Sequence, residues 1–169
     1  MHRAFLSAAI LAWLVALAPD SFAKPRRFGF QNFGSLQKGG YSIVSAQGTS
    51  AGPSTVRIHA APNGRSANVA WKNTFYTEHG SYGVTMRWRF LGDGTLAAST
   101  IDPRVTGPSV TGSFTLNGSR AIPFAATAGG VTANGIIRKN GGGSVAITLT
   151  LKGLPEGDVT CSFSGGRVR

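Results

Sequence analysis

The residues best placed to do chemistry in this chain are its surplus cations, because it has 17 Lys and Arg against 6 Asp and Glu, a formal net charge of +11. A field of this sign attracts polyanions such as anionic glycans, lipid headgroups or nucleic acids. The candidate polyanion contacts are Arg57, Lys72, Arg87, Arg89 and Arg138, which fall on the polar faces of strand-like segments. The alternative is a solvated surface that protects strand edges, and the spread of the cations over many strands favours it.

Aromatic side chains form the second group of interest, because most of them share the apolar face of the same segments. The ordinary interpretation is a packed core, but a small barrel can also enclose one apolar ligand. Asn73 falls between Trp71 and Phe75 on that face and needs a partner, which could be a ligand or a water, unless a bulge turns it outward. The candidate cavity residues are Trp71, Asn73, Phe75, Trp88, Phe90, Tyr76, His79 and Tyr82. Of these, Tyr76, His79 and Tyr82 are expected near one end of the domain.

Catalytic and metal-binding patterns are absent from the sequence. The acids lie mostly in or beside predicted turns, and His59 and His79 have no ligand spacing around them. No Gly-x-Ser-x-Gly elbow and no phosphate-binding loop occur. We therefore predict no catalytic residue, no cofactor and no metal, and Cys161 is expected to be a buried core residue without a disulfide partner.

The first 23 residues are typical of a secretory signal peptide. His2 and Arg3 precede an apolar run over residues 4–18, and Ser21-Phe22-Ala23 is a small-x-small cleavage site. The alternative is an uncleaved anchor. We expect export to the periplasm or the medium, a mature chain that starts at Lys24, and no membrane-spanning segment after it.

The mature chain divides into two parts. Residues 24–38 are basic and carry Phe28, Phe30 and Phe33, which suit either a tail or a short plug over one end of the domain. Residues 39–169 have β periodicity throughout. The ten predicted strands are 40–48, 54–61, 66–77, 84–91, 94–100, 108–116, 120–126, 130–138, 144–152 and 158–164. Their short connections predict an antiparallel meander.

Five hairpin turns set the expected register of this meander. The turns are Asn63-Gly64, Gly92-Asp93-Gly94, Asn117-Gly118-Ser119, Asn140-Gly141-Gly142 and Leu154-Pro155-Glu156. In order, they pair Val56 with Trp71, Phe90 with Leu96, Phe114 with Ile122, Ile137 with Val145, and Leu149 with Cys161.

A meander with one apolar face closes into a barrel or folds over into a sandwich, and we favour a small barrel because closure removes exposed edges. Gly112 and Gly135 on the apolar face suit sharp strand bending. Such a barrel resembles the calycin architecture of lipocalins and fatty-acid-binding proteins. The Gly-x-Trp of lipocalins is replaced here by Gly39-Gly40-Tyr41, so no family membership is inferred.

Three functional hypotheses follow from these patterns. The first is an exported, non-catalytic barrel that binds a small apolar molecule inside or an anionic envelope polymer outside, with no specific nucleic-acid motif. The second is a structural or interaction module without a small ligand. The third is a barrel-mouth enzyme that uses Glu78, His79 or Tyr82.

Overall fold

The chain folds as an antiparallel meander of β-strands. The computed structural model describes residues 28–102, 105–106, 110–116, 120–128, 130–155 and 157–168, so the predicted signal peptide and its cleavage site lie outside the described residues. The strands are β1 (Leu36–Ser45), β2 (Gly48–Ala60), β3 (Ala67–Thr77), β4 (Gly80–Phe90), β5 (Thr95–Asp102), β6 (Val105–Thr106), β7 (Val110–Phe114), β8 (Ala121–Ala128), β9 (Val131–Lys139), β10 (Val145–Lys152) and β11 (Val159–Arg167). Two single 3₁₀ turns are η1 (Phe30–Asn32) and η2 (Gly141–Gly143).

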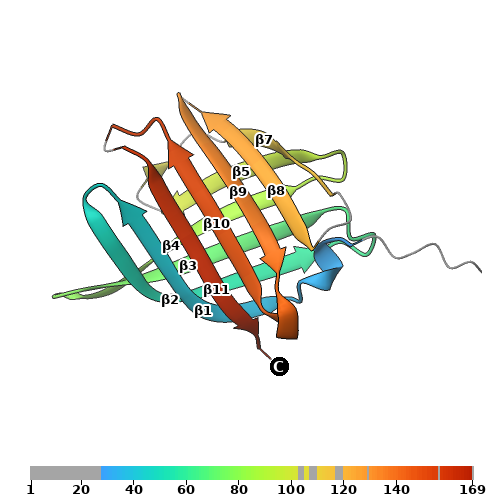
Figure 1. Cartoon of the computed structure of the whole chain (residues 1–169), viewed down its shortest axis with the longest axis horizontal. Coiled ribbons are helices and arrows are strands. Elements are labelled where there is room, and N and C mark those ends of the chain that lie inside the picture. The colour runs from blue at the N-terminus through green and yellow to red at the C-terminus, as the bar shows by residue number, and fades with distance from the viewer. Residues whose placement is uncertain are drawn as a thin grey trace, which may run out of the picture.

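The meander closes on itself (Figure 1). Each long strand pairs antiparallel with the next, the two-residue β6 adds to the end of β5, and β1 pairs with β11 from Gln37–Arg167 to Val44–Thr160. The result is a ten-stranded up-and-down barrel. The predicted barrel is therefore confirmed and the sandwich alternative is wrong. A sandwich would leave edge strands with unpaired backbone groups, whereas here β1 and β11 pair with each other and close the sheet.

Three of the five predicted hairpin registers are confirmed. Val56 pairs with Trp71, Phe90 with Leu96, and Leu149 with Cys161. In each of these hairpins, a one-residue slip would have turned the apolar set toward water, so the alternation fixes the faces.

The other two predicted registers are wrong by two residues. Phe114 pairs with Phe124 rather than Ile122, and Ile137 pairs with Ile147 rather than Val145. The second hairpin closes through a hydrogen bond from Asn140 N to Ser144 O, and its turn is Gly141–Gly143, one residue later than expected. A two-residue shift keeps every side chain on its face, so hydrophobic alternation does not detect it. The predicted turn at 117–119 lies outside the described residues.

The first hairpin was not predicted. The expected strand over 40–48 runs through the actual turn between Ser45 and Gly48, and β1 begins earlier, at Leu36. The ladder between β2 and β3 ends at the pair Ser54–Asn73. The next residue of β2 is Pro53, which has no N–H to donate and so accounts for the end of that ladder.

The β3–β4 hairpin therefore continues beyond the barrel as a two-stranded ribbon. From Thr74 to Thr77, β3 pairs with residues 80–83 of β4, and no other strand of the described residues pairs with this part. In Figure 1 the ribbon projects at the left, at the opposite end of the barrel from η1.

Aromatic rings fill much of the barrel interior. Trp71 packs edge-on against Trp88 and Phe163, and Phe90 contacts Phe114 and Phe124. Gly135 lies directly under the ring of Phe124, where a Cβ would collide with it. The absence of a side chain at Gly135 therefore makes room for the ring of Phe124, whereas we had expected this glycine to allow sharp strand bending. Cys161 is buried among these residues, as expected.

The N-terminal aromatic segment plugs one end of the barrel. Phe30 and Phe33 are fully buried, and the ring of Phe30 lies 4.8 Å from that of Phe90 and 5.8 Å from that of Phe114. A backbone hydrogen bond from Phe30 N to Gly64 O ties the segment to the β2–β3 turn. For the described residues of this segment, from Phe28 onward, the structure shows the plug.

Candidate functional site: a basic face on the outside of the barrel

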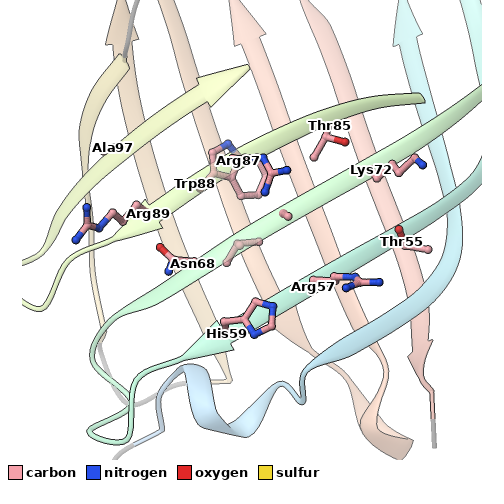
Figure 2. A pocket seen from close by; sticks show the side chains of 12 residues that line it. Thr55, Arg57, His59, Asn68, Lys72, Thr85, Arg87, Trp88, Arg89 and Ala97 are labelled. Atoms are coloured by element: carbon pink, nitrogen blue, oxygen red, sulfur yellow. The ribbon is translucent and has the colours of Figure 1, made fainter. Parts of the chain in front are cut away.

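Four of the five predicted polyanion contacts gather on one outer surface. Arg57 on β2, Lys72 on β3, and Arg87 and Arg89 on β4 are exposed and line one shallow hollow together with His59 (Figure 2). Each of them alternates with a buried neighbour, which turns all four side chains to the outside.

Strand register places these cations in rows across the sheet. Arg57 pairs with Ala70, and Ala70 pairs with Arg87, so a methyl group separates the two guanidinium-bearing positions. At about 4.8 Å per strand, their backbones are roughly 10 Å apart. Two long, flexible arginines at this separation can close on one anionic group above Ala70.

A neighbouring row adds a cation that the sequence did not suggest. Lys38 on β1 pairs with Thr55, and Lys72 pairs with Thr85, so lysine and threonine alternate over four strands. Lys38 is exposed on the same side. Sequence reasoning missed it because it assigned residues up to 38 to the N-terminal segment, whereas β1 begins at Leu36. We call Lys38, Arg57, Lys72, Arg87 and Arg89 the basic face.

Lys72 is held against the sheet by a glycine. A Cβ at Gly83 would lie 2.6 Å from Lys72 Cε, closer than side chains pack. The aliphatic stem of Lys72 therefore crosses β4 at Gly83 and carries its ammonium toward the β3–β4 ribbon.

The basic face has no internal neutralising partners. Strands β1 to β4 contain no Asp or Glu, and the nearest acids in the sequence are Glu78 and Asp93 in the turns. Within the described part of the chain, none of its five cations forms an ion pair, whereas Lys152 lies 3.9 Å from Asp158 on another part of the barrel. An uncompensated cluster of this kind concentrates positive potential.

Arg138 does not belong to this surface. It is exposed on β9, which β1, β11 and β10 separate from β2. It is thus a natural comparison residue: a cation of the same type on a different part of the barrel.

The candidate cavity residues divide between the interior and the outside. Trp71, Asn73, Trp88 and Phe90 are buried in the barrel. Asn73 finds its partner within the protein, because the hydroxyl of Ser54 donates to Asn73 Oδ1 at 2.7 Å and accepts from Trp71 Nε1 at 2.8 Å. Its partner was foreseeable from the Asn63-Gly64 register, which places Ser54 opposite Asn73.

The remaining cavity candidates lie on the ribbon and on both of its faces. Phe75 and Tyr82 stack on the inner face with ring centroids 5.1 Å apart, and the ring of Tyr41 on β1 packs against Phe75 at a tilt of 50°. Tyr76 points to the outer face and is 69% exposed. His79 lies in the exposed turn, where its N–H donates to Thr77 Oγ1. Tyr76 and Tyr82, both predicted to line one cavity, thus lie on opposite faces of the ribbon.

A buried glutamine was also missed by sequence reasoning. Gln37 is fully buried next to the plug, and its Nε2 donates to Phe33 O at 2.7 Å. Its Oε1 has no hydrogen-bond partner among the described residues. The amide therefore ties the plug to β1.

The described residues contain no arrangement that favours metal binding or a reactive thiol. No group of three or more His, Cys, Asp or Glu side chains is close enough there to hold a metal ion. Burial raises the pKa of the Cys161 thiol, which disfavours the reactive thiolate. No helix among these residues is long and apolar enough to cross a membrane.

Comparison with known proteins supports the fold. No protein-family model matches the chain, and no curated protein matches it either. Among solved structures, it is similar to the S-type phycobiliprotein lyase CPES from Guillardia theta, with a TM-score of 0.56 and 10% identity, over 85% of this chain and 95% of that one. At this identity the likeness shows the fold alone, a lipocalin-like closed barrel.

Proposed function

We propose that this protein is an exported, non-catalytic barrel that binds an anionic polymer of the cell envelope on its basic face. The observation that carries the proposal is the clustering of Lys38, Arg57, Lys72, Arg87 and Arg89 on four strands that contain no acid. The predicted signal peptide in residues 1–23 supports export.

A small apolar ligand in the barrel interior has less support. The centroids of neighbouring buried aromatic rings lie 4.8 to 6.4 Å apart, and the plug occupies one end of the barrel. Asn73, the polar side chain that had suggested a ligand, accepts a hydrogen bond from the hydroxyl of Ser54 instead. The hollow among the candidate residues lies outside, over β2 to β4.

The test is the salt dependence of binding to a polyanion such as heparin, measured on the mature chain by titration calorimetry. If the five cations contact the polymer, log K falls against log salt with a slope of roughly −3 to −4, at about 0.7 per neutralised charge. Binding that is absent at low salt, or independent of salt, would overturn the proposal.

Two double variants with equal loss of charge locate the surface. Arg57→Gln with Arg87→Gln is expected to weaken binding by roughly tenfold or more and to reduce the slope by about 1.4. Arg138→Gln with Lys152→Gln removes the same net charge elsewhere and should change the affinity less than about twofold. Equal losses in both variants would show diffuse attraction and no defined face.

Export has its own test. Either the periplasm or the medium of the native host should contain a chain whose N-terminus is Lys24, as read by mass spectrometry. Recovery of an uncleaved chain in the membrane fraction would instead support the anchor alternative.

A further inference from the structure

The outer face of β3 continues from the basic face onto the projecting ribbon. Lys72, Thr74 and Tyr76 occupy successive outward positions, and their partners on β4 are Thr85, Gly83 and Ser81. At about 3.4 Å per residue, Tyr76 lies roughly 14 Å beyond Lys72. The stem of Lys72 leans over Gly83 toward the ribbon, which shortens the gap between its ammonium and the tyrosine.

Tyr76 is unusual among the large apolar side chains of the described residues. It is the most exposed of them, at 69%, and it lies on the same outer face as the cations, whereas Tyr82 stacks on Phe75 on the inner face. A tyrosine offers a rigid ring face at low entropic cost, together with a polar tip. An exposed ring in line with cations indicates a ligand that has both ring faces and negative charges.

Hydroxyl and amide groups separate the cations along this surface. Thr55 and Thr85 alternate with Lys38 and Lys72 in one row, and Asn68 lies between His59 and Arg89 in another. These groups are suited to hydrogen-bond the hydroxyls of sugars between charged substituents. Single-stranded nucleic-acid sites instead use several aromatic side chains for successive bases, and Tyr76 is the one exposed aromatic of the described outer face here.

We propose that the occupant of the basic face is an anionic polysaccharide that runs along β3 and stacks one sugar ring on Tyr76. This inference rests on the proposed function, because the cations supply most of the attraction. Glu78, two residues beyond Tyr76 in the exposed turn, repels further anionic residues and sets the end of the track.

The experiment compares a heparin fragment with inorganic polyphosphate and with oligo(dT), all of matched total charge, at one salt concentration, on the mature chain. Polyphosphate has the charges but no ring faces. Tyr76→Ala is expected to weaken heparin binding by roughly five- to tenfold, which is the scale of one aromatic stacking contact, and to leave polyphosphate binding within about twofold. Tyr76→Phe should keep the wild-type preference, and Tyr82→Ala, on the inner face, should have no effect on either ligand.

The outcomes separate this inference from the proposed function. Suppose that the Arg57 and Arg87 double variant loses affinity for both heparin and polyphosphate. If Tyr76→Ala then keeps its affinity for both ligands, or loses affinity for both to the same extent, the polysaccharide inference fails and the basic face stands. If oligo(dT) binds more tightly than heparin and depends on Tyr76, the ligand class is nucleic acid. If none of the polyanions binds, both proposals fall.

Discussion

Ala70 is the residue on which the geometry of the basic face depends. Arg57 and Arg87 flank it on the neighbouring strands, and its methyl group leaves the space between them open. A larger or charged side chain at this position would fill the space in which we propose that an anionic group binds.

Ala70→Glu should therefore weaken polyanion binding strongly without unfolding the protein. The new carboxylate lies between the two arginines and pairs with them, so polyanion affinity should fall by roughly tenfold or more while the melting temperature changes little. Ala70→Gln, which adds the same bulk without charge, should lose less. A Glu variant that binds heparin as the wild type does would contradict this geometry.

Gly83 should matter only through Lys72. Valine is conformationally acceptable there, since Gly83 does not have a left-handed backbone, but its methyl groups would displace the lysine stem. We expect Gly83→Val to weaken polyanion binding by about two- to threefold in the wild type and to have no further effect in Lys72→Ala, as a double-mutant cycle would show. An equal loss in both backgrounds would refute the link.

Cys161 should be unreactive in the folded protein. Burial raises its thiol pKa, so the fold favours the protonated form; this contribution to stability is complete below the ordinary thiol pKa and is lost as pH rises above it. We expect a thiol-specific disulfide reagent at pH 8 to label the chain only in denaturant. Rapid labelling of the native protein would place the thiol at the surface.

At the scale of elements, the plug and the ribbon give the two ends of the barrel different roles. Phe30 and Phe33 close one end with buried rings, and Gln37 holds the backbone of Phe33. At the other end, Pro53 ends the β2–β3 ladder and releases the ribbon that carries Tyr76.

Phe30→Ala tests the plug as a structural element. Loss of a fully buried phenylalanine should lower the free energy of unfolding by about 3 to 5 kcal/mol in urea denaturation. Tyr76→Ala, an exposed aromatic of the ribbon, should change it by less than about 0.5 kcal/mol. If Phe30→Ala lowered the free energy of unfolding no more than Tyr76→Ala does, the N-terminal segment would be a tail that does not stabilise the barrel.

The sequence could predict the faces of these elements but not every register. Alternation assigned Arg57, Lys72 and Arg87 to the outside, because the inside and outside of a closed barrel differ in polarity. It could not distinguish registers that differ by two residues, as at Phe114 and Ile137. It also could not bring Lys38 to the basic face, because that step needs the pairing of β1 with β2.

At the scale of the whole molecule, the successive antiparallel pairing of β1 to β4 brings cations from four strands onto one outer surface of the barrel. The five cations of the basic face come from four successive strands, between residues 38 and 89, and these strands are neighbours in the sheet. The lipocalin-like fold provides the scaffold, and the surface that we propose for binding lies outside it, over β1 to β4.

The most direct test of this account is a map of backbone amide chemical shifts of the ¹⁵N-labelled mature chain during titration with a heparin fragment. The account predicts shifts concentrated in β1 to β4 and in the ribbon around Tyr76, with β8 to β10 unaffected. Shifts of similar size around the whole barrel, or confined to the buried aromatic residues, would contradict a binding face on the outside of these four strands.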